Sequence, residues 1–265
     1  MTTETRSWLF IDTGEHPGAW NMRFDEHMAE RVRRGVSGPV LRLFRWNPPA
    51  ISLGLHQDIE EVDAVRCAGD GIDMVRRPTG GRAILHDEEL TYAVVMQARG
   101  SIMEVYKRIS LALVRGLRNF GADVGIGRLQ PEHLGAAGSP SSIPCFTSTA
   151  KYEIEWRGRK LVGSAQRQYR EEGVVLQHGS ILTGPAHRRL VRYLRADEPT
   201  QDRLTREMEL KTVDLGEIMG RGADLHDLAT CIRRGFEEEW DIVLHATDAA
   251  KRKEWTHVPT EHSRG

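Results

Sequence analysis

The sequence predicts an α/β (α+β) fold, a mixed and mainly antiparallel sheet that is flanked by helices. The segments 151–168 and 173–183 contain three strand-like runs in succession, which favours an antiparallel meander. From Pro185 onward the apolar residues recur with the helical period instead. One apolar stripe of this kind comprises Leu225, Leu228, Ile232, Phe236 and Trp240. Strands followed by helices within one chain are typical of this fold class.

The length of 265 residues suffices for one large domain. We expect this single domain to span residues 1–249, with a sheet-rich core over about residues 36–185 and a helical C-terminal part over about residues 186–249. The polar residues 250–265 are expected to form a frayed tail.

The net charge and the spacing of the cysteines exclude several classes of protein. The formal net charge is −1, so no global field attracts the chain to nucleic acid or to an anionic membrane. The first apolar run, residues 8–11, is too short for a signal peptide or a membrane span. The 3 cysteines are widely spaced and form neither a disulfide framework nor a metal-binding pattern. We therefore expect a cytoplasmic protein that binds neither nucleic acid nor membrane.

The first elements alternate between strand and helix. Residues 8–12 predict a strand, and Asn21 is expected to cap a helix that ends near Gly35. The segments "PVLRLFRW" and "AISLGL" predict two strands separated by a rigid Asn-Pro-Pro turn. Two more strand-like runs, residues 83–85 and 91–95, are joined by a polar turn.

The second half begins with the clearest helix of the chain. Ser101 and Glu104 have the spacing of a capping box, and Gly121 is placed to end the helix. Residues 125–144 are rich in Gly, Pro and Ser and predict a long loop, a kind of segment that is often functional. The meander follows, with Arg157 and Gly158 as the turn between its first two strands.

The stretch "RRPTGGRAILHDEELTYAVV" places two glycines beside arginines. It is no nucleotide-binding motif, because a strand rather than a helix follows, and the lysine and hydroxyl residue of a P-loop are missing. The backbone of Gly80 and Gly81 could form the floor of a binding site for an acyl chain or an anion, with arginines such as Arg77 as anion partners. Alternatively, they form a tight turn beside solvated arginines. His86 suits either a hydrogen-bonded core residue or a site residue.

Cys145 follows the long loop and has two interpretations. It is either a small buried hydrophobe or a thiolate nucleophile. A free thiol has a pKa of about 8.5 and needs a cationic neighbour to react well at neutral pH. Lys160, just after the hairpin turn, is one candidate neighbour, although most lysines are solvated surface charges. The small residues Gly163-Ser164-Ala165 indicate either close packing or a ligand-facing strand.

Several segments together resemble the biotin/lipoate protein ligase superfamily. "RRPTGGRAILHDEELTY" is similar to its signature RR-x-x-GG-x-x-x-x-HD, and "GRKLVGSAQR" is similar to its lysine motif. "FRWNPPAISLGLHQ" and "VVLQHGSIL" also resemble family segments. The likeness runs in one colinear order over residues 8–236.

Two features favour one branch of this superfamily. ATP-dependent lipoate ligases usually carry a third glycine where this chain has Arg82. "PCFTSTAKYEI" is similar to the CF-x-x-x-x-x-YE segment of cysteine-dependent octanoyltransferases of the Gram-positive type. The chain thus resembles octanoyl-acyl carrier protein:protein N-octanoyltransferases. The Gly- and Ser-rich loop before Cys145 departs from the family pattern.

The resemblance implies roles for individual residues. Cys145 matches the nucleophile that forms the acyl thioester, and Lys160 matches the lysine that lowers the pKa of this thiol and helps to move protons. The residues expected to bind substrate are Arg77, Gly80, Gly81, His86, Gly163, Ser164 and Ala165.

The same resemblance implies the partners. No cofactor or metal is expected. The donor is octanoyl-acyl carrier protein, and the acceptor is a lipoyl domain such as the glycine cleavage H protein. An octanoyl amidotransferase acting between lipoyl domains, an ATP-dependent lipoate ligase and a non-catalytic binding module are the alternatives.

Overall fold

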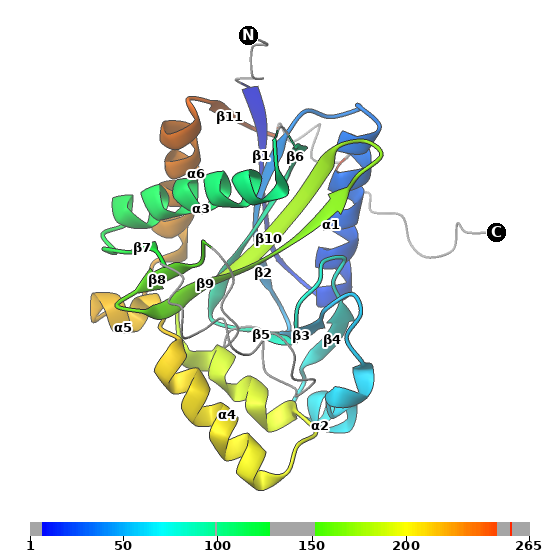
Figure 1. Ribbon diagram of the computed structural model, residues 1–265, viewed down its shortest axis with the longest axis vertical. Coiled ribbons are helices and arrows are strands. Elements are labelled where there is room, and N and C mark those ends of the chain that lie inside the picture. Colours follow the sequence, from blue (N-terminus) through cyan, green and yellow to red (C-terminus); the bar gives the residue numbers. More distant parts are fainter. Residues whose placement is uncertain (1–6, 99, 128–151, 248–254, 256–265) are drawn as a thin grey trace, which may run out of the picture.

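The structure is a computed structural model that describes residues 7–98, 100–127, 152–247 and Trp255. Its main sheet has eight strands (Figure 1). In chain order they are β1 (Ser7–His16), β2 (Val40–Trp46), β6 (Glu89–Gln97), β7 (Gly125–Ile126), β8 (Ile154–Trp156), β9 (Arg159–Tyr169), β10 (Val174–Leu182) and β11 (Val243–Ala246). They lie in the order β11-β1-β2-β6-β10-β9-β8-β7.

The pairing within this sheet is mixed. Strand β1 runs parallel to both β2 and β11, and the other neighbours are antiparallel. A second sheet of three strands has the order β4-β3-β5. Its strands are β3 (Ala50–Leu53), β4 (Asp73–Arg76) and β5 (Ile84–His86). The predicted fold class, a mixed and mainly antiparallel sheet with flanking helices, is confirmed.

Helices cover both faces of the main sheet. They are α1 (Gly18–Arg33), α2 (Ala64–Gly69), α3 (Ile102–Asn119), α4 (Glu198–Lys211), α5 (Leu215–Met219) and α6 (Leu225–Trp240), with the 3-10 helices η1 (Ile59–Glu61) and η4 (Pro185–Tyr193). Helix α1 lies on one face, and α3 and α6 lie on the other (Figure 1). Each face has its own apolar core, so burial on both sides fixes which residues of each strand point which way.

Helix α3 begins and ends as its sequence predicts. The Ser101 hydroxyl accepts a hydrogen bond from the Glu104 amide, and the Glu104 carboxylate accepts one from the Ser101 amide. A cap of this kind stabilises a helix by about 1 kcal/mol. Gly121, just beyond the end, has a φ of +102°, a conformation that favours glycine.

The prediction that Asn21 caps the first helix is wrong. Helix α1 begins at Gly18, and Asn21 lies buried within its first turns. The Asn21 amide donates to the carbonyls of His16 and Arg45, while its oxygen accepts from the Arg42 guanidinium at 2.6 Å. Arg42 is wholly buried and needs oxygen acceptors, so a residue type suited to a cap serves a tertiary contact instead.

The predicted meander is confirmed. Strands β8, β9 and β10 pair in succession and antiparallel, and Arg157 and Gly158 form the turn between the first two. Both turn residues have positive φ, 52° and 77°, as the tight turns of hairpins require. Residues 83–85 and 91–95 do form neighbouring strands, but β5 joins the small sheet and β6 the main one.

The main sheet also includes strands outside residues 36–185, the segment that was expected to be rich in strands. Strand β1 lies before this segment and β11 after it, and the two pair with each other. Within the expected polar tail, Trp255 is buried, and the Arg31 guanidinium lies 4.4 Å from its ring centroid. One aromatic residue in a polar segment shows no periodicity, so the pattern alone gave no sign of this contact.

No helix in the described part of the chain is long and apolar enough to cross a membrane.

The buried His187 on η4 makes the stability of the fold dependent on pH. Burial, aided by the charge of Arg188, lowers the pKa of His187 from 6.5 to about 4. Between these pH values the unfolded chain binds a proton at this residue that the folded chain does not. The free energy of unfolding should therefore fall by about 1 kcal/mol per pH unit as the pH drops through this window.

This dependence can be tested by urea denaturation of the wild type and of His187→Gln at pH 7 and pH 5. The wild type should lose more stability between the two pH values than the variant does. An equal loss in both proteins would contradict the assignment to His187.

Candidate active site

A narrow cavity lies between the main sheet, the small sheet and α1. It is lined by Met22, Trp46, Ser52, Arg77, Ile84, His86, Thr91, Gly163, Ser164, Ala165, His178, Gly179 and Ser180. Five of the predicted substrate-binding residues therefore meet here, from three separate parts of the chain. Its volume is about 20 Å³, enough for roughly one water molecule. A fatty chain can enter only if the walls move apart.

Arg77 is buried and binds the loop that contains the two glycines. Its guanidinium donates to the carbonyl oxygens of Ser52 at 2.9 Å, Gly80 at 2.8 Å and Arg82 at 2.8 Å. Arg76 donates to three further carbonyls, and Arg82 forms an ion pair with Glu61. The alternative of solvated arginines beside a turn does not hold for Arg77, which is buried, whereas Arg76 is exposed and Arg82 is partly exposed.

Gly80 and Gly81 are not among the residues that line the cavity. Gly81 has a φ of +95°, which L side chains rarely adopt. A Cβ on Gly54 would lie 1.9 Å from the Gly81 carbonyl oxygen, so two backbone segments touch here. The glycines predicted a close approach to a ligand, and the close contact that the structure shows is with another part of the chain.

His86 is both a hydrogen-bonded core residue and part of the cavity wall. Its Nδ1 lies 2.8 Å from Glu89 Oε1, and its Nε2 lies 2.7 Å from the Ser52 hydroxyl. The Trp46 ring stacks on the imidazole with 4.0 Å between centroids. Trp46 in turn donates from Nε1 to the Thr91 hydroxyl at 2.7 Å. The ring of His86 is thus fixed on both edges and on one face.

His178, which the sequence analysis did not single out, lies in a second buried chain of polar groups. Its Nδ1 is 2.9 Å from Asp25 Oδ2, and its Nε2 is 2.6 Å from Thr79 Oγ1. Burial lowers the pKa of His178, and the neighbouring Asp25 opposes this shift. The segment "VVLQHGSIL" contained the signal for His178, but the contact with Asp25 spans 153 residues and has no local pattern.

A β-bulge places Lys160 on the cavity side of the main sheet. The register between β8 and β9 shifts at Leu161, so that one step on β8 matches two on β9. Leu161 and Val162 are consequently both buried in the core under α3 and α6, although neighbours in a regular strand face opposite ways. The shift returns Lys160 to the face of β9 that carries Gly163 and Ala165.

Lys160 forms a buried ion pair with Glu153. The Lys160 Nζ lies 2.5 Å from Glu153 Oε1, and both residues are at most 5% exposed. The interpretation of Lys160 as a solvated surface charge therefore fails. Glu153 was missed as a site residue, although it is the glutamate of the "YE" pair in the segment "PCFTSTAKYEI". A charged pair this deeply buried is stable only when each partner stays in place.

The hydroxyl of Ser164 lies on the opposite face of β9 from the cavity. It bonds to the Tyr92 hydroxyl at 2.7 Å, and the register aligns Ser164, Gly179 and Tyr92 across three adjacent strands. A Cβ on Gly179 would lie 2.8 Å from both Ser164 Oγ and the Tyr92 ring. Glycine at position 179 therefore leaves room for this contact, and Ser164 meets the cavity through its backbone.

Cys145 lies outside the residues that the structure describes, so its approach to Lys160 stays a prediction. The other two cysteines are poor candidates for a nucleophile. Burial raises the pKa of the Cys67 thiol to about 11 and also raises that of Cys231. Neither would be a thiolate at neutral pH.

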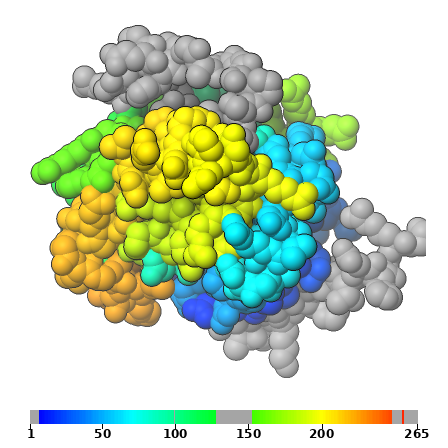
Figure 2. Space-filling model, turned by 90° about the horizontal axis from the view of Figure 1, so that it is seen from below, coloured from blue at the N-terminus to red at the C-terminus, as the bar shows by residue number. Residues whose placement is uncertain are grey.

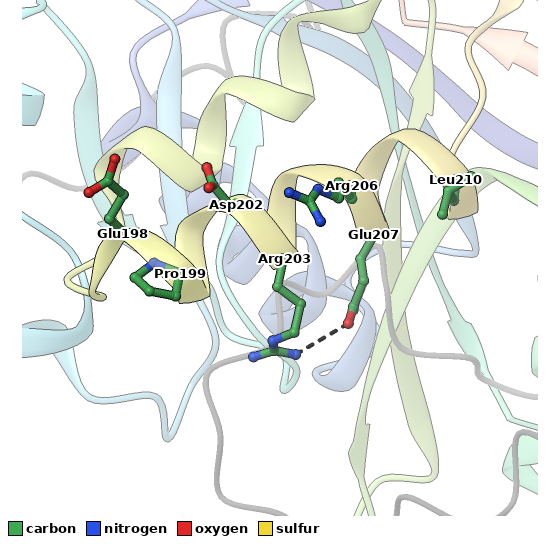
Figure 3. Close-up of a pocket in the computed structure, with 7 residues that line it drawn as sticks. All are labelled: Glu198, Pro199, Asp202, Arg203, Arg206, Glu207 and Leu210. Carbon is green, nitrogen blue, oxygen red and sulfur yellow. Dashed lines mark hydrogen bonds and ion pairs between the residues drawn. The ribbon is translucent and has the colours of Figure 1, made fainter.

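A second hollow runs along α4 and is shallow. All seven of its lining residues come from this one helix, and Arg203 pairs with Glu207 at 3.2 Å (Figure 3). Seen from below, the yellow α4 and the cyan region around α2 form this end of the molecule (Figure 2). The hollow is a charged helix face rather than an enclosed site, so we place the candidate active site in the cavity between the two sheets. Lys160 is not among the residues that line this cavity.

Comparison with known proteins identifies the family of the chain. Residues 17–237 match the family model described as the lipoyl protein ligase A/B catalytic domain. The chain is 40% identical over 240 residues to octanoyltransferase LipM of Kyrpidia tusciae, covering 88% of this chain and 87% of that protein. It is 33% identical over 259 residues to octanoyltransferase LipM of Bacillus subtilis, covering 94% and 92% respectively.

Solved structures support the fold. A bi-partite lipoate protein ligase from Thermoplasma acidophilum superposes with a TM-score of 0.72 at 22% identity, covering 96% of this chain and 90% of that chain. Lipoate-protein ligase A bound with ATP superposes with a TM-score of 0.70 at 21% identity, covering 96% and 93%. The chain therefore belongs to the lipoyl protein ligase A/B catalytic domain family, in its octanoyltransferase branch, and is an acyltransferase that moves octanoyl groups in lipoate biosynthesis.

Proposed function

We propose that this enzyme takes octanoyl from octanoyl-acyl carrier protein and passes it to a lysine of a lipoyl domain, such as the glycine cleavage H protein, through a thioester on Cys145. The observation that supports this most directly is the buried Lys160–Glu153 pair on the cavity face of β9. A buried cation on the strand face that also carries cavity residues, in a segment that follows a cysteine in the sequence, suits covalent acyl transfer.

The reaction proceeds in two balanced steps. In the first, the Cys145 thiolate attacks the thioester carbonyl, a new carbon–sulfur bond forms, and the pantetheine thiolate leaves and takes up a proton. In the second, the amine of the acceptor lysine attacks the enzyme thioester, an amide forms, and Cys145 is released. One thioester is exchanged for another and then for a more stable amide, so the donor supplies the driving force without ATP.

Lys160 is suited to both steps. As an ammonium it stabilises a neighbouring thiolate by charge attraction and can protonate the departing pantetheine sulfur. It can then accept a proton from the attacking amine. Glu153 at 2.5 Å offsets the burial of this positive charge and fixes where the Nζ atom lies.

The cavity is suited to an apolar chain. Met22 and Ile84 contribute apolar surface, and the small residues Gly163 and Ala165 leave room beside the strand. The two histidines in the wall are bonded at both ring nitrogens to protein groups. A hydrocarbon can therefore lie against them without leaving a donor or an acceptor unsatisfied.

Mass spectrometry tests the proposal directly. Incubation of the enzyme with octanoyl-acyl carrier protein, without ATP, is expected to add the mass of one octanoyl group, which hydroxylamine removes. Adding a lipoyl domain should discharge this adduct and modify the domain. Acylation only by an octanoylated lipoyl domain would identify an amidotransferase, and a requirement for ATP would identify a ligase; either result contradicts the proposal.

A further inference from the structure

Two hydrogen-bonded chains of carboxylate, imidazole and hydroxyl groups each bind the loop of residues 77–82. One chain runs from Asp25 through His178 to Thr79. The other runs from Glu89 through His86 and the Ser52 hydroxyl to Arg77, which in turn binds the Gly80 carbonyl. Both imidazoles are buried, and both line the cavity. Hydrogen bonds therefore connect the loop of residues 77–82 to two histidines that line the cavity.

The first chain is complete when His178 is neutral. The imidazole Nδ1–H donates to Asp25, and the Thr79 hydroxyl donates to Nε2. The other oxygen of Asp25 accepts from the Arg42 guanidinium at 2.6 Å. Each proton in this row has one acceptor, so the arrangement needs no water to satisfy it.

The order hydroxyl, imidazole, carboxylate is also that of a nucleophile with its base and orienting acid. Two observations argue against this role for Thr79. Thr79 is wholly buried, and it is not among the residues that line the cavity. Because both nitrogens of His178 are already bonded, the ring also has no position from which to take a proton from a substrate. The chain therefore fixes structure and performs no chemistry of its own.

The hydrogen bonds from Asp25 through His178 to Thr79 connect three walls of the cavity. Asp25 lies one turn after Met22 on α1, and Met22 lines the cavity. His178 belongs to β10, whose Ser180 also lines it. Thr79 belongs to the loop that begins with Arg77, another lining residue. The bonds from Asp25 to Thr79 thus set the spacing between a helix, a strand and a loop that enclose the same space.

We propose that Asp25, His178 and Thr79 are positioning residues that set the relative placement of the helix, strand and loop walls of the cavity, so that they control binding of the acyl donor rather than the rate of the chemical steps. This inference rests on the proposed octanoyl transfer. Loss of the Thr79–His178 bond would leave a buried imidazole nitrogen unsatisfied, and the loop would move to relieve it.

The test compares Thr79→Val with Thr79→Ser. Valine keeps the branched shape and removes the hydroxyl, whereas serine keeps the hydroxyl. We expect Thr79→Val to raise KM for octanoyl-acyl carrier protein about tenfold, as for one buried hydrogen bond, and to change kcat much less. Thr79→Ser should return KM close to the wild-type value. Thr205→Val, which removes an exposed hydroxyl on α4, serves as the matched control and should keep the wild-type KM.

Other outcomes overturn the inference. A wild-type KM in Thr79→Val, even with a lowered melting temperature, would show that the bond serves stability alone. Equal loss in the valine and serine variants would assign the effect to side-chain size. Both results assume that the wild-type enzyme is acylated, and failure of that reaction would instead contradict the proposed function.

A second set of variants decides the matter if Thr79→Val does not fold. His178→Gln and Thr79→Ala should each raise KM, and the double variant should show no further rise over His178→Gln alone, because the hydroxyl acts through the imidazole. A wild-type KM in His178→Gln would refute the role of the chain. An additive effect in the double variant would show that Thr79 acts independently of His178.

Discussion

Replacing Cys145 by alanine should abolish octanoyl transfer while the fold persists. The covalent route has no alternative nucleophile in the described chain, because burial raises the pKa of both Cys67 and Cys231. We expect the rate to fall by on the order of a thousandfold or more, since loss of a nucleophile usually removes most of an enzyme's catalysis. The measurement is the initial rate of lipoyl-domain octanoylation without ATP, read by mass spectrometry.

Two controls make this result specific. The double variant Cys67→Ala/Cys231→Ser keeps Cys145 as its single thiol and should retain activity and the octanoyl adduct. Cys145→Ser should show little or no adduct, because a serine hydroxyl is a far weaker nucleophile without a strong base. Transfer by Cys145→Ala at a tenth of the wild-type rate or more would exclude the thioester route.

Replacing Lys160 should slow the acylation of Cys145 by about a hundredfold or more, which is the scale of general acid–base catalysis. It should also raise the pH midpoint for alkylation of Cys145 by iodoacetamide by about one unit or more, because a nearby cation is lost. The single variant Lys160→Ala is difficult to interpret, since it leaves the Glu153 carboxylate buried without its cation. Such an uncompensated charge costs about 3–5 kcal/mol of stability.

The double variant Lys160→Met/Glu153→Gln separates catalysis from stability. It removes both charges and keeps similar volumes, so its melting temperature should lie closer to the wild type than that of Lys160→Ala. Its acylation rate should remain low, and its alkylation midpoint should remain high. A folded double variant with a wild-type alkylation midpoint would remove Lys160 from the proposed role.

Local patterns in the sequence predicted the elements well and their partners less well. The capping box at Ser101 and the turn at Arg157-Gly158 are decided within a few residues, and both are confirmed. The pairing of β1 with β11 joins the two ends of the chain, and no short-range pattern contains it. Asn21 shows the limit clearly, because its residue type suits a helix cap and equally suits a buried amide that binds an arginine.

In the candidate site, too, local motifs predicted individual residues better than their long-range partners. The sequence motifs indicated Arg77, His86 and the small residues of β9, and the structure brings them to one cavity. They did not indicate Asp25, whose bond to His178 depends on how α1 packs against the sheet. The glycine pair predicted that a ligand comes close to the backbone there, and in the structure it is the backbone of Gly54 that comes close.

The bulge at Leu161 has a consequence for how the lysine motif can change. In a regular strand, residues an odd number apart lie on opposite faces, yet Lys160 and Gly163 share one. The extra residue shifts the alternation of side chains between the two faces, so that Lys160 lies on the face it would not occupy in a regular strand. Substitutions at Leu161 or Val162 change how the core is filled but leave Lys160 on the same face of the strand. Deleting a single residue there would instead turn the Lys160 ammonium to the side of α3 and α6. The position of the charge in this hairpin is therefore determined by a count of residues more than by their identity.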